Sequence, residues 1–317
     1  MLLGAGKLAG SIANEIMGRL DSGYRIAAFV GKDKPRFPIG DIQLYNNGDK
    51  LRSICRRHDA DIIVVALDDR RGKMPVHELI DCKLDGLRVL DGISFFEKLT
   101  GNIMVEQVNP DWIIFASGFS IGRLMNALKR TGDILLASLG LVMSSPIMLF
   151  SALIIKLESP GPVFYCQNRV GLYGKPFKLI KFRSMRKDAE KHGAVWAKEN
   201  DNRVTRFGGF ARKVRIDELP QLWNVLKGEM SFVGPRPERP VFVEMLAEKI
   251  PYYSLRHNIK PGVTGWAQIC YPYGASEEDA LRKLEYDLYY LKNISLSMDF
   301  WIVFQTIKTV LFRKGAR

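Results

Sequence analysis

The stretch ILLASLGLVMSSPIMLFSALII, residues 134–155, contains no charged side chain. Lys129 and Arg130 precede it, and Lys156 follows it. A helix of about 20 apolar residues is long enough to cross the hydrocarbon core of a bilayer. The alternative is a buried core helix of a soluble domain, in which an uncharged run of this length is uncommon. The stretch therefore predicts a helix that enters a membrane.

Ser144, Ser145 and Pro146 lie in the middle of this stretch. Proline removes one backbone hydrogen bond and kinks a helix, and serine hydroxyls can satisfy the carbonyl groups that lose a partner inside lipid. Basic residues flank both ends, so the positive-inside rule gives no reason for the ends to lie on opposite sides. We therefore expect a re-entrant helix over about 134–155 that breaks at Ser145 and Pro146.

Charge divides the 317 residues into two unlike parts. Residues 1–119 carry 16 Lys and Arg against 16 Asp and Glu, whereas residues 120–317 carry 31 against 18. The second part is thus suited to a polyanionic partner: nucleic acid, anionic lipid or a phosphorylated substrate. The four cysteines are far apart and form no CxxC pair, which argues against a disulfide framework or a zinc site.

Short apolar runs alternate with helical patterns from residue 1 to about 118. Strands are predicted at 24–30, 61–67 and 87–90, and helices near 7–20, 48–58 and 75–84. This alternation is typical of an α/β layer with a parallel sheet. Gly4, Gly6 and Gly10 stand where a Rossmann-type unit has its phosphate loop, but their spacing is GxGxxxG. Two interpretations stay open: weak candidates for cofactor binding, or glycines that only allow a tight strand-to-helix turn.

A second apolar helix is predicted near the end, over 295–312 (SLSMDFWIVFQTIKTVLF). Aromatic and aliphatic residues with sparse charge suit a helix that lies in the headgroup plane of a membrane. A plain core helix fits the pattern as well.

The stretch IDELPQLWNVL, residues 216–226, holds two adjacent carboxylates, Asp217 and Glu218. Pro220 fits the first turn of a helix, Leu219 before it is expected outside the α region, and Gly228 marks the helix end. Free N–H groups and the helix dipole would then keep Asp217 ionised and attract a phosphate. Such a pair can hold Mg²⁺ together with phosphate oxygens. An acidic pair is more often only a solvated helix start or cap.

Basic side chains surround this pair in the sequence and change its interpretation. They are Lys181, Arg183, Arg212, Arg215 and Arg236, the last of which stands between Pro235 and Pro237. A stiff backbone reduces the entropy lost when a guanidinium grips a phosphate. Although a basic stretch is usually a solvated face, cations around a carboxylate pair beside a membrane segment are what phosphoryl transfer at a membrane surface requires.

Residues 129–312 resemble the bacterial sugar transferase family, the monotopic phosphoglycosyl transferases. The motifs that carry the resemblance are Ser145-Pro146, Ser159-Pro160-Gly161-Pro162, Gln167-Asn168-Arg169-Val170-Gly171, Lys181-Phe182-Arg183-Ser184-Met185, Asp217-Glu218-Leu219-Pro220-Gln221, Gly234-Pro235-Arg236-Pro237 and Pro261-Gly262-Val263-Thr264-Gly265. Residues 1–118 look like the Rossmann-like, CoA-binding-like domain of the family's large form, related to polyprenyl-phosphate hexose-1-phosphate transferases. That form normally begins with a membrane bundle, so we expect the sequence to be truncated.

The resemblance implies a fold and an activity. The fold is α/β: a Rossmann-like domain over 1–118, then a membrane-associated, α-rich catalytic domain over 119–317 with a re-entrant helix and interfacial helices. The enzyme would transfer a sugar 1-phosphate from a UDP-sugar to polyprenyl (undecaprenyl) phosphate and release UMP, the initiating step of cell-surface polysaccharide synthesis for capsule, O-antigen or exopolysaccharide. The sugar could be glucose, galactose or an acetylated hexosamine.

Roles for single residues follow from the same resemblance. Asp217 would be the nucleophile that forms a covalent aspartyl-phosphosugar. Glu218 would assist as a metal-associated or proton-handling group, with Mg²⁺ held at Asp217 and Glu218. The residues expected to bind substrate are Arg169, Lys181, Arg183, Arg212, Arg215, Pro235, Arg236 and Pro237. The expected setting is the cytoplasmic face of the bacterial inner membrane, with membrane lipid as a partner, no nucleic acid, and compatibility with a homodimer.

Two departures from the family pattern stand out. Gly132 precedes Asp133 where the family usually has phenylalanine, and Arg215 stands where many relatives carry Ser or Thr. The first leaves open how the start of the apolar helix packs, and the second adds a cation beside the dyad.

Two other functions compete with this one. A nucleotide-sugar dehydratase or epimerase of the short-chain type needs a Tyr-x-x-x-Lys pair, and no tyrosine here has lysine four residues on. A non-catalytic membrane-surface adaptor would use the basic charge alone. It explains neither the acidic pair nor the Pro-Arg-Pro sequence.

Overall fold

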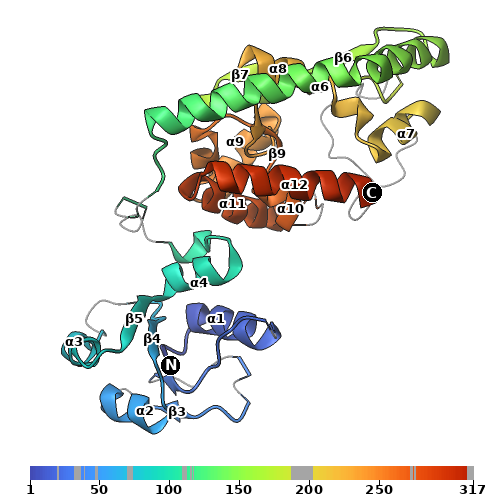
Figure 1. Ribbon diagram of the computed structural model, residues 1–317. Helices are drawn as coiled ribbons and strands as arrows, with labels where there is room; N and C mark the ends of the chain where they lie inside the picture. The colour runs from blue at the N-terminus through green and yellow to red at the C-terminus, as the bar shows by residue number, and fades with distance from the viewer. Residues whose placement is uncertain are drawn as a thin grey trace. The chain divides into compact units, whose positions relative to one another are not determined.

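The computed structural model describes residues 1–19, 21–31, 37–38, 40–46, 49–69, 74–108, 113–114, 116, 118–186, 203–271, 274 and 276–312, with only the backbone of 310–312. The chain divides into two compact units, Met1–Phe115 and Ala116–Arg317 (Figure 1). Each unit has its own secondary structure and its own buried cluster.

The first unit is a mixed α/β layer built on a parallel sheet. Its strands are β1 (Leu2–Leu3), β2 (Phe29–Val30), β3 (Leu44–Tyr45), β4 (Ile62–Val65) and β5 (Arg88–Asp91), in the order β3-β2-β1-β4-β5. The helices are α1 (Lys7–Gly18), α2 (Leu51–Arg57), α3 (Val76–Leu84) and α4 (Gly92–Thr100), followed by a 3₁₀ turn at Val105–Gln107. Helices α1 and α4 lie on one side of the sheet, and α2 and α3 on the other (Figure 1). The α/β character and the parallel sheet predicted from the sequence are confirmed.

Strand order in this sheet reverses between β1 and β4, which are neighbours although β2 and β3 separate them in the chain. In open parallel sheets, ligands bind in the crevice outside the carboxyl ends of the strands at such a reversal. The glycine loop after β1 and the loop after β4 meet there. The predicted strand at 24–30 is shorter than expected, with only Phe29–Val30 in the ladder.

The second unit is mostly helical, with two small pairs of strands. The helices are α6 (Arg123–Glu158), α7 (Arg206–Lys213), α8 (Gln221–Lys227), α9 (Pro240–Lys249), α10 (Trp266–Cys270), α11 (Glu277–Lys292) and α12 (Leu296–Phe312), with 3₁₀ turns at Leu172–Gly174, Ile216–Glu218 and Tyr253–Asn258. The strands β6 (Phe164–Val170) and β7 (Pro176–Phe182) form an antiparallel hairpin, and β8 (Ser231–Val233) pairs in parallel with β9 (Gly262–Thr264).

Helix α6 buries mainly small or polar side chains and exposes large apolar ones, which is the reverse of an amphipathic helix in a soluble protein. Apart from Ile155 near its end, the side chains that it buries are small or polar, among them Ala137, Ser144 and Ser151. Its large apolar side chains face outward; Val142 is 72% exposed and Leu149 is 73% exposed. Within the part of the chain that the structure describes, α6 is the one helix long and apolar enough to cross a membrane. This exposure removes the core-helix alternative for residues 134–155.

Helix α6 continues through Pro146 as a single helix, so the predicted break at Ser145 and Pro146 is wrong. Proline at 146 has no N–H to donate to the carbonyl of Val142, four residues earlier. The hydroxyl of Ser145 donates to that carbonyl oxygen at 2.8 Å, and the hydroxyl of Ser144 donates to the Gly140 carbonyl at 2.6 Å. Ser145 therefore compensates for the proline, as predicted, whereas Ser144 binds a carbonyl that the proline does not affect. A helix that enters and leaves a membrane on one side stays a prediction.

The start of α6 is fixed to the rest of its unit by three charged side chains. Lys129 Nζ lies 2.6 Å from a carboxylate oxygen of Asp299 in α12. Arg130 donates to the carbonyls of the last residues of α8 at 2.6 and 2.7 Å. Asp133 Oδ1 accepts from Ser231 and Phe232 of β8 at 3.0 and 2.9 Å. A Cβ at Gly132 would meet nothing within 4 Å, so the space of the family's phenylalanine stays open.

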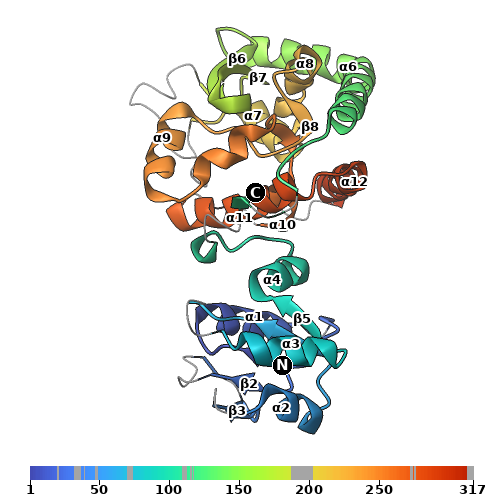
Figure 2. The same ribbon diagram turned by 90° about the vertical axis from the view of Figure 1, so that its left-hand side faces the viewer.

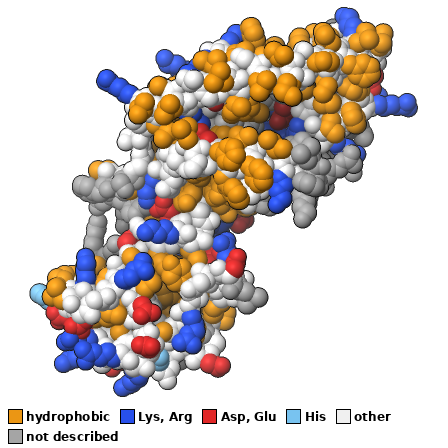
Figure 3. Space-filling view, in the orientation of Figure 1, with side chains coloured by type: hydrophobic (Ala, Val, Ile, Leu, Met, Phe, Trp, Pro, Cys, Tyr) orange, Lys and Arg blue, Asp and Glu red, His pale blue; other side chains and the backbone are white. Residues whose placement is uncertain are grey.

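Helix α12 runs beside α6 and adds to its apolar surface (Figures 1 and 2). Phe300, Trp301, Phe304 and Ile307 are exposed, whereas Ile302 is fully buried. Figure 3 shows hydrophobic side chains gathered over both helices on one face. The helix is therefore partly a core helix and partly an exposed apolar one, so each of the two interpretations of 295–312 describes one of its faces.

Candidate active site

The acidic pair lies in a tight turn ahead of α8. Arg215 adopts a left-handed conformation (φ 60°), the 3₁₀ turn covers Ile216–Glu218, and α8 begins directly after Pro220. Gly228 ends α8 at φ 84°, as the sequence predicts. The prediction that Leu219 lies outside the α region is wrong: it has φ −54° and ψ −37°. Successive 3₁₀ hydrogen bonds carry the chain through this residue into α8 and outweigh the steric preference before proline.

Glu218 gathers three cations on one oxygen. Its Oε1 lies 2.9 Å from Arg236 Nη2, 3.3 Å from Lys181 Nζ and 3.4 Å from Arg215 Nη1. Burial alone would raise the pKa of this carboxyl, but the three cations hold its pKa below the usual range. Burial lowers the pKa of Lys181, and Glu218 opposes that shift. Glu218 is therefore a fixed anion that assembles positive charge in the absence of substrate.

Asp217 is buried and incompletely satisfied. Its side chain is 7% exposed, and its Oδ1 has no hydrogen-bond partner among the residues that the structure describes. Burial raises the pKa of this carboxyl to about 6, Glu218 adds to the rise, and Lys181 and Arg212 oppose it. The prediction that backbone N–H groups keep Asp217 ionised names the wrong cause: no described N–H binds its Oδ1, although a pKa of about 6 still leaves the carboxyl mostly ionised at pH 7. The carboxylate is instead desolvated, which makes it more basic and leaves one oxygen available.

The structure brings only some of the predicted substrate-binding residues to the pair. Lys181, Arg215 and Arg236 reach Glu218, and Arg212 acts on Asp217 through its charge while its Nε donates to Ser184 Oγ at 2.9 Å. These side chains come from β7, from the turn that carries the pair, from the loop after β8 and from α7. The site is thus built from segments that are far apart in sequence.

Two predicted residues, Arg169 and Arg183, bind backbone instead of the pair. Arg169 donates to the Pro237 carbonyl at 3.0 Å and so holds the loop that carries Arg236. Arg183 is buried, and its guanidinium donates to the carbonyls of Ile155, Ser159 and Pro160 at 3.2, 2.7 and 3.1 Å. Arg183 thus ties the end of α6 to the following loop. Substrate contact by these two arginines stays a prediction.

The donor set of the pair limits the metal that it could hold. Among the described residues, no group of three or more His, Cys, Asp or Glu side chains is placed to hold an ion. Magnesium needs few protein ligands, because it binds through one or two carboxylates plus waters and phosphate oxygens. The unpartnered Oδ1 of Asp217 fits that role. Glu218 Oε1, already shared among three cations, fits it less well.

Sequence reasoning missed Arg256 and Asp287, which form a buried ion pair at 2.8 Å beneath the Arg236 loop. They lie in a 3₁₀ turn and in α11, 31 positions apart, in stretches without any motif. No local pattern connects two such residues, so no sequence signal could have paired them.

The glycine loop of the first unit faces a carboxylate of the same chain. Asp68, which follows β4, accepts from the backbone N–H groups of Lys7 and Leu8 at 2.9 and 3.1 Å, at the start of α1. A Cβ on Gly6 would lie 2.1 Å from an Asp68 oxygen, and one on Gly4 would lie 2.2 Å from the Ala66 carbonyl. A Cβ on Gly10 would lie 2.7 Å from the Phe37 ring. All three glycines thus have a packing reason. Cofactor binding by them stays a prediction.

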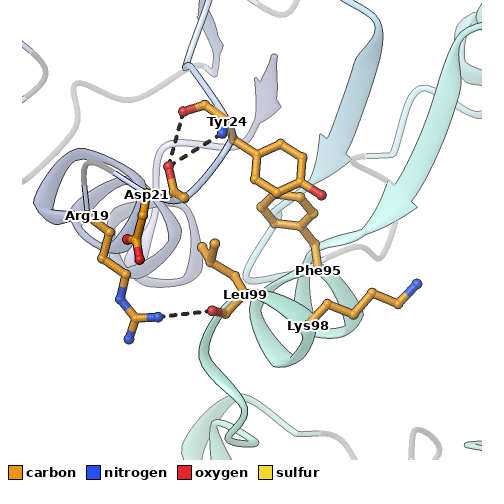
Figure 4. Close-up of a pocket in the computed structure, with 7 residues that line it drawn as sticks. Arg19, Asp21, Tyr24, Phe95, Lys98 and Leu99 are labelled. Atoms are coloured by element: carbon orange, nitrogen blue, oxygen red, sulfur yellow. Dashed lines mark hydrogen bonds between the residues drawn. The ribbon is translucent and has the colours of Figure 1, made fainter.

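The first unit also contains a cavity of about 270 Å³ at the opposite end of α1 (Figure 4). Tyr24 and Phe95 meet edge to face there, with ring centroids 5.0 Å apart. Arg19 closes one side by donating to the Leu99 carbonyl at 3.1 Å. This cavity lies away from the glycine loop and holds no buried, unpartnered polar group that would indicate a ligand.

A family model and several known proteins match large parts of the chain. The family model described as bacterial sugar transferase matches residues 124–313. A UDP-N-acetylgalactosamine-undecaprenyl-phosphate N-acetylgalactosaminephosphotransferase of Aeromonas hydrophila is 43% identical over 266 residues, which cover 82% of this chain and 61% of that protein. A UDP-glucose:undecaprenyl-phosphate glucose-1-phosphate transferase of Escherichia coli (strain K12) is 39% identical over 264 residues, 82% of this chain and 56% of that protein.

A third relative matches a shorter part of the chain at higher identity. A putative undecaprenyl-phosphate N-acetylgalactosaminyl 1-phosphate transferase of Bacillus subtilis (strain 168) is 58% identical over 130 residues, 41% of this chain and 73% of that protein. The chain spans about three fifths of the length of the first two relatives. The resemblance seen in the sequence motifs is confirmed.

Proposed function

The chain belongs to the bacterial sugar transferase family, and we propose that it transfers a sugar 1-phosphate from a UDP-sugar to undecaprenyl phosphate, with release of UMP. The names of the relatives support the two substrate classes. Those names include both N-acetylgalactosamine and glucose, so these two sugars are the first donors to test. The product would be the lipid diphosphate sugar that initiates a surface polysaccharide.

The observation that carries the proposal is the buried Asp217 oxygen without a partner, beside a cluster of cations. In the first step, an Asp217 carboxylate oxygen would attack the phosphorus that bears the sugar. The bond from this phosphorus to the bridging oxygen breaks, and UMP leaves with the electron pair. In the second step, an oxygen of undecaprenyl phosphate attacks the same phosphorus and the Asp217 carboxylate is released. Desolvation strengthens the nucleophile in the first step.

The cations supply the electrostatic part of this chemistry. Both steps place negative charge beside a carboxylate, and fixed positive groups stabilise such charge without reorganisation. Arg236, Lys181 and Arg215 are held in place by Glu218 before substrate arrives. Diphosphate oxygens would then share these donors with Glu218.

A magnesium ion fits the proposal as a group held by Asp217 and by substrate phosphate oxygens, where it would neutralise charge as phosphate meets carboxylate. The residues of the chain orient the reacting groups around it: Glu218 fixes the cations, and Arg212 faces Asp217 through its charge.

The setting is proposed to be the cytoplasmic face of a bacterial membrane. The outward apolar side chains of α6 and the aromatic face of α12 support contact with lipid. A re-entrant path would require the continuous helix α6 to bend at Pro146 in the membrane, and it would keep both ends of the helix, and thus the acidic pair, at headgroup level. The first unit has the strand order of a Rossmann-like domain, which supports that assignment.

The test is release of UMP by the protein in detergent with magnesium and either UDP-N-acetylgalactosamine or UDP-glucose. With undecaprenyl phosphate present, we expect UMP release over many turnovers. With the donor alone, we expect about one UMP per protein molecule and a hexose-phosphate adduct on Asp217. An adaptor would release no UMP, and a nucleotide-sugar-modifying enzyme would change the sugar and leave the diphosphate intact. Turnover without any adduct on Asp217 would remove the covalent step.

A further inference from the structure

The loop that carries Arg236 is held through four consecutive carbonyl groups. Gly262 N donates to the Pro235 carbonyl at 2.9 Å, and Val170 N donates to the Glu238 carbonyl at 2.9 Å. Two guanidinium groups hold the carbonyls between them: Arg256 Nη2 donates to that of Arg236 at 3.1 Å, and Arg169 Nη1 donates to that of Pro237 at 3.0 Å. Arg169 and Val170 are neighbours in β6, whereas Arg256 and Gly262 lie in the stretch from the Tyr253–Asn258 turn to β9.

The sequence of the loop explains why arginine side chains are needed. Pro235 and Pro237 have no backbone N–H, so the loop cannot pair with a strand through alternating donors and acceptors. Four of its carbonyls accept the bonds that hold it in place. A guanidinium has several donors in a fixed plane and can bind a carbonyl and a second acceptor at once, which a lysine ammonium does less rigidly.

Arg256 binds the loop carbonyl and a second acceptor at the same time. Its side chain is 6% exposed and lies 2.8 Å from Asp287, whose side chain is 2% exposed. Its Nη1 donates to the hydroxyl of Tyr253 at 2.6 Å. A buried ion pair is costly to desolvate and is often no more stable than apolar residues of the same volume. Stability alone therefore does not explain why a charged pair lies under this loop.

We propose that Arg256, oriented by Asp287, is a positioning residue that fixes the backbone of Arg236 so that the Arg236 guanidinium is presented at the Asp217–Glu218 pair. Arg256 acts from beneath the loop through the Arg236 carbonyl, while the Arg236 side chain reaches Glu218 at 2.9 Å. This proposal rests on the proposed function, in which Arg236 meets the diphosphate of the donor.

The test is a double-mutant cycle on kcat/KM for the UDP-sugar. Arg256→Lys keeps the charge beside Asp287 but gives up the planar fork, and we expect a loss of about tenfold. Arg236→Ala should lose about 100-fold. If Arg256 acts through Arg236, the double variant loses no more than Arg236→Ala alone, whereas independent effects would multiply to about 1,000-fold.

Two further variants guard against a merely structural effect. Asp287→Asn keeps an acceptor for Arg256 and should cost about threefold, again without further effect in the Arg236→Ala background; it replaces Arg256→Lys if that variant does not fold. Arg282→Lys is the matched control, because Arg282 also pairs with a buried carboxylate on α11, that of Glu285, at 3.0 Å. The control should keep the wild-type kcat/KM, and all variants are assayed below their measured melting temperatures.

Affinity for UMP, measured by calorimetry, gives the same cycle without turnover. Losses that add in both measurements would overturn the positioning role, as would an equal loss in Arg282→Lys. A wild-type protein that releases no UMP from any donor contradicts the proposed function. In that case, the comparison of UMP affinity between the single variants and the double variant still decides whether Arg256 acts through Arg236.

Discussion

The two units each hold an aspartate at the point where ligand chemistry is expected, but the two side chains are treated in opposite ways. Asp68 gives both oxygens to backbone N–H groups at the start of α1. Asp217 keeps a buried oxygen without a partner among the described residues. A satisfied carboxylate at a helix start stabilises a fold. A buried, unsatisfied one costs stability and calls for a functional explanation. The contrast favours the second unit as the one that carries the proposed chemistry.

The largest expected effect is that of Asp217→Asn, which removes the proposed nucleophile. UMP release should fall by at least about 10⁴-fold. The free energy of unfolding, in contrast, should increase. The folded-state pKa of about 6 exceeds the ordinary value of 3.8, so folding favours the protonated form, and the charged form is penalised as the pH rises above about 4 and through 6. A neutral amide avoids that penalty and should add up to about 3 kcal/mol at pH 7.

Enzyme assays and chemical denaturation at pH 7 and pH 4 check both parts. The gain in stability should be present at pH 7 and absent at pH 4. Activity close to wild type, or a stability loss at pH 7, would break the contrast between the two aspartates.

Glu218→Gln should act in the opposite sense on stability. The cations lower the pKa of Glu218, so its charged form stabilises the folded state. The amide leaves Arg236, Lys181 and Arg215 facing one another with weaker compensation. With partial solvent screening, we expect a loss of about 1–3 kcal/mol. Donor turnover should fall about 100-fold, because the cations lose their fixed positions. Denaturation and UMP assays on the same samples measure this, and a stabilised Glu218→Gln would refute the role of Glu218 as organising anion.

The dependence of kcat/KM on pH should show a smaller effect than these two substitutions. Because Asp217 must be ionised to attack and has a pKa of about 6, kcat/KM for the donor should fall tenfold per pH unit below about 6. Arg212 is one of the cations that lower this pKa, so Arg212→Gln should move the acid limb to higher pH. A limb that stays near pH 4 in both proteins would mean that Asp217 is not desolvated during catalysis.

What the sequence could predict depends on whether the signal is local. The apolar run at 134–155, the serine that compensates Pro146 and the glycine that ends α8 are each decided by a few neighbouring residues, and the structure contains all three. The cations were predicted by type from their motifs. Their common acceptor, Glu218 Oε1, depends on how β7 and the loop after β8 pack, which no spacing in the sequence records.

Arg183 is a residue whose motif was recognised but whose observed contacts were not predicted. Its motif suggested substrate binding, yet the carbonyls at the end of α6 engage its guanidinium. A motif indicates that an arginine is needed but not which acceptor it serves. The predicted cause of the ionisation of Asp217 fails for a similar reason, because the pKa of this carboxyl is set by burial, which arises from packing, more than by the local helix dipole.

The smallest effect is expected for Asp68→Ala, which tests the satisfied aspartate. Loss of the two N–H contacts at α1 should destabilise the first unit by about 1–2 kcal/mol, as for other helix caps. Asp68→Asn keeps one acceptor oxygen and should lose less. UMP release should stay unchanged in both, since Asp68 lies outside the unit that carries the acidic pair. Inorganic phosphate should restore part of the stability of Asp68→Ala and none of the wild type, because the start of α1 regains an anion only in the variant. Phosphate or a dinucleotide that stabilises the wild type equally would show that Asp68 gives way to a ligand, and the two aspartates would then differ less than their hydrogen bonds suggest.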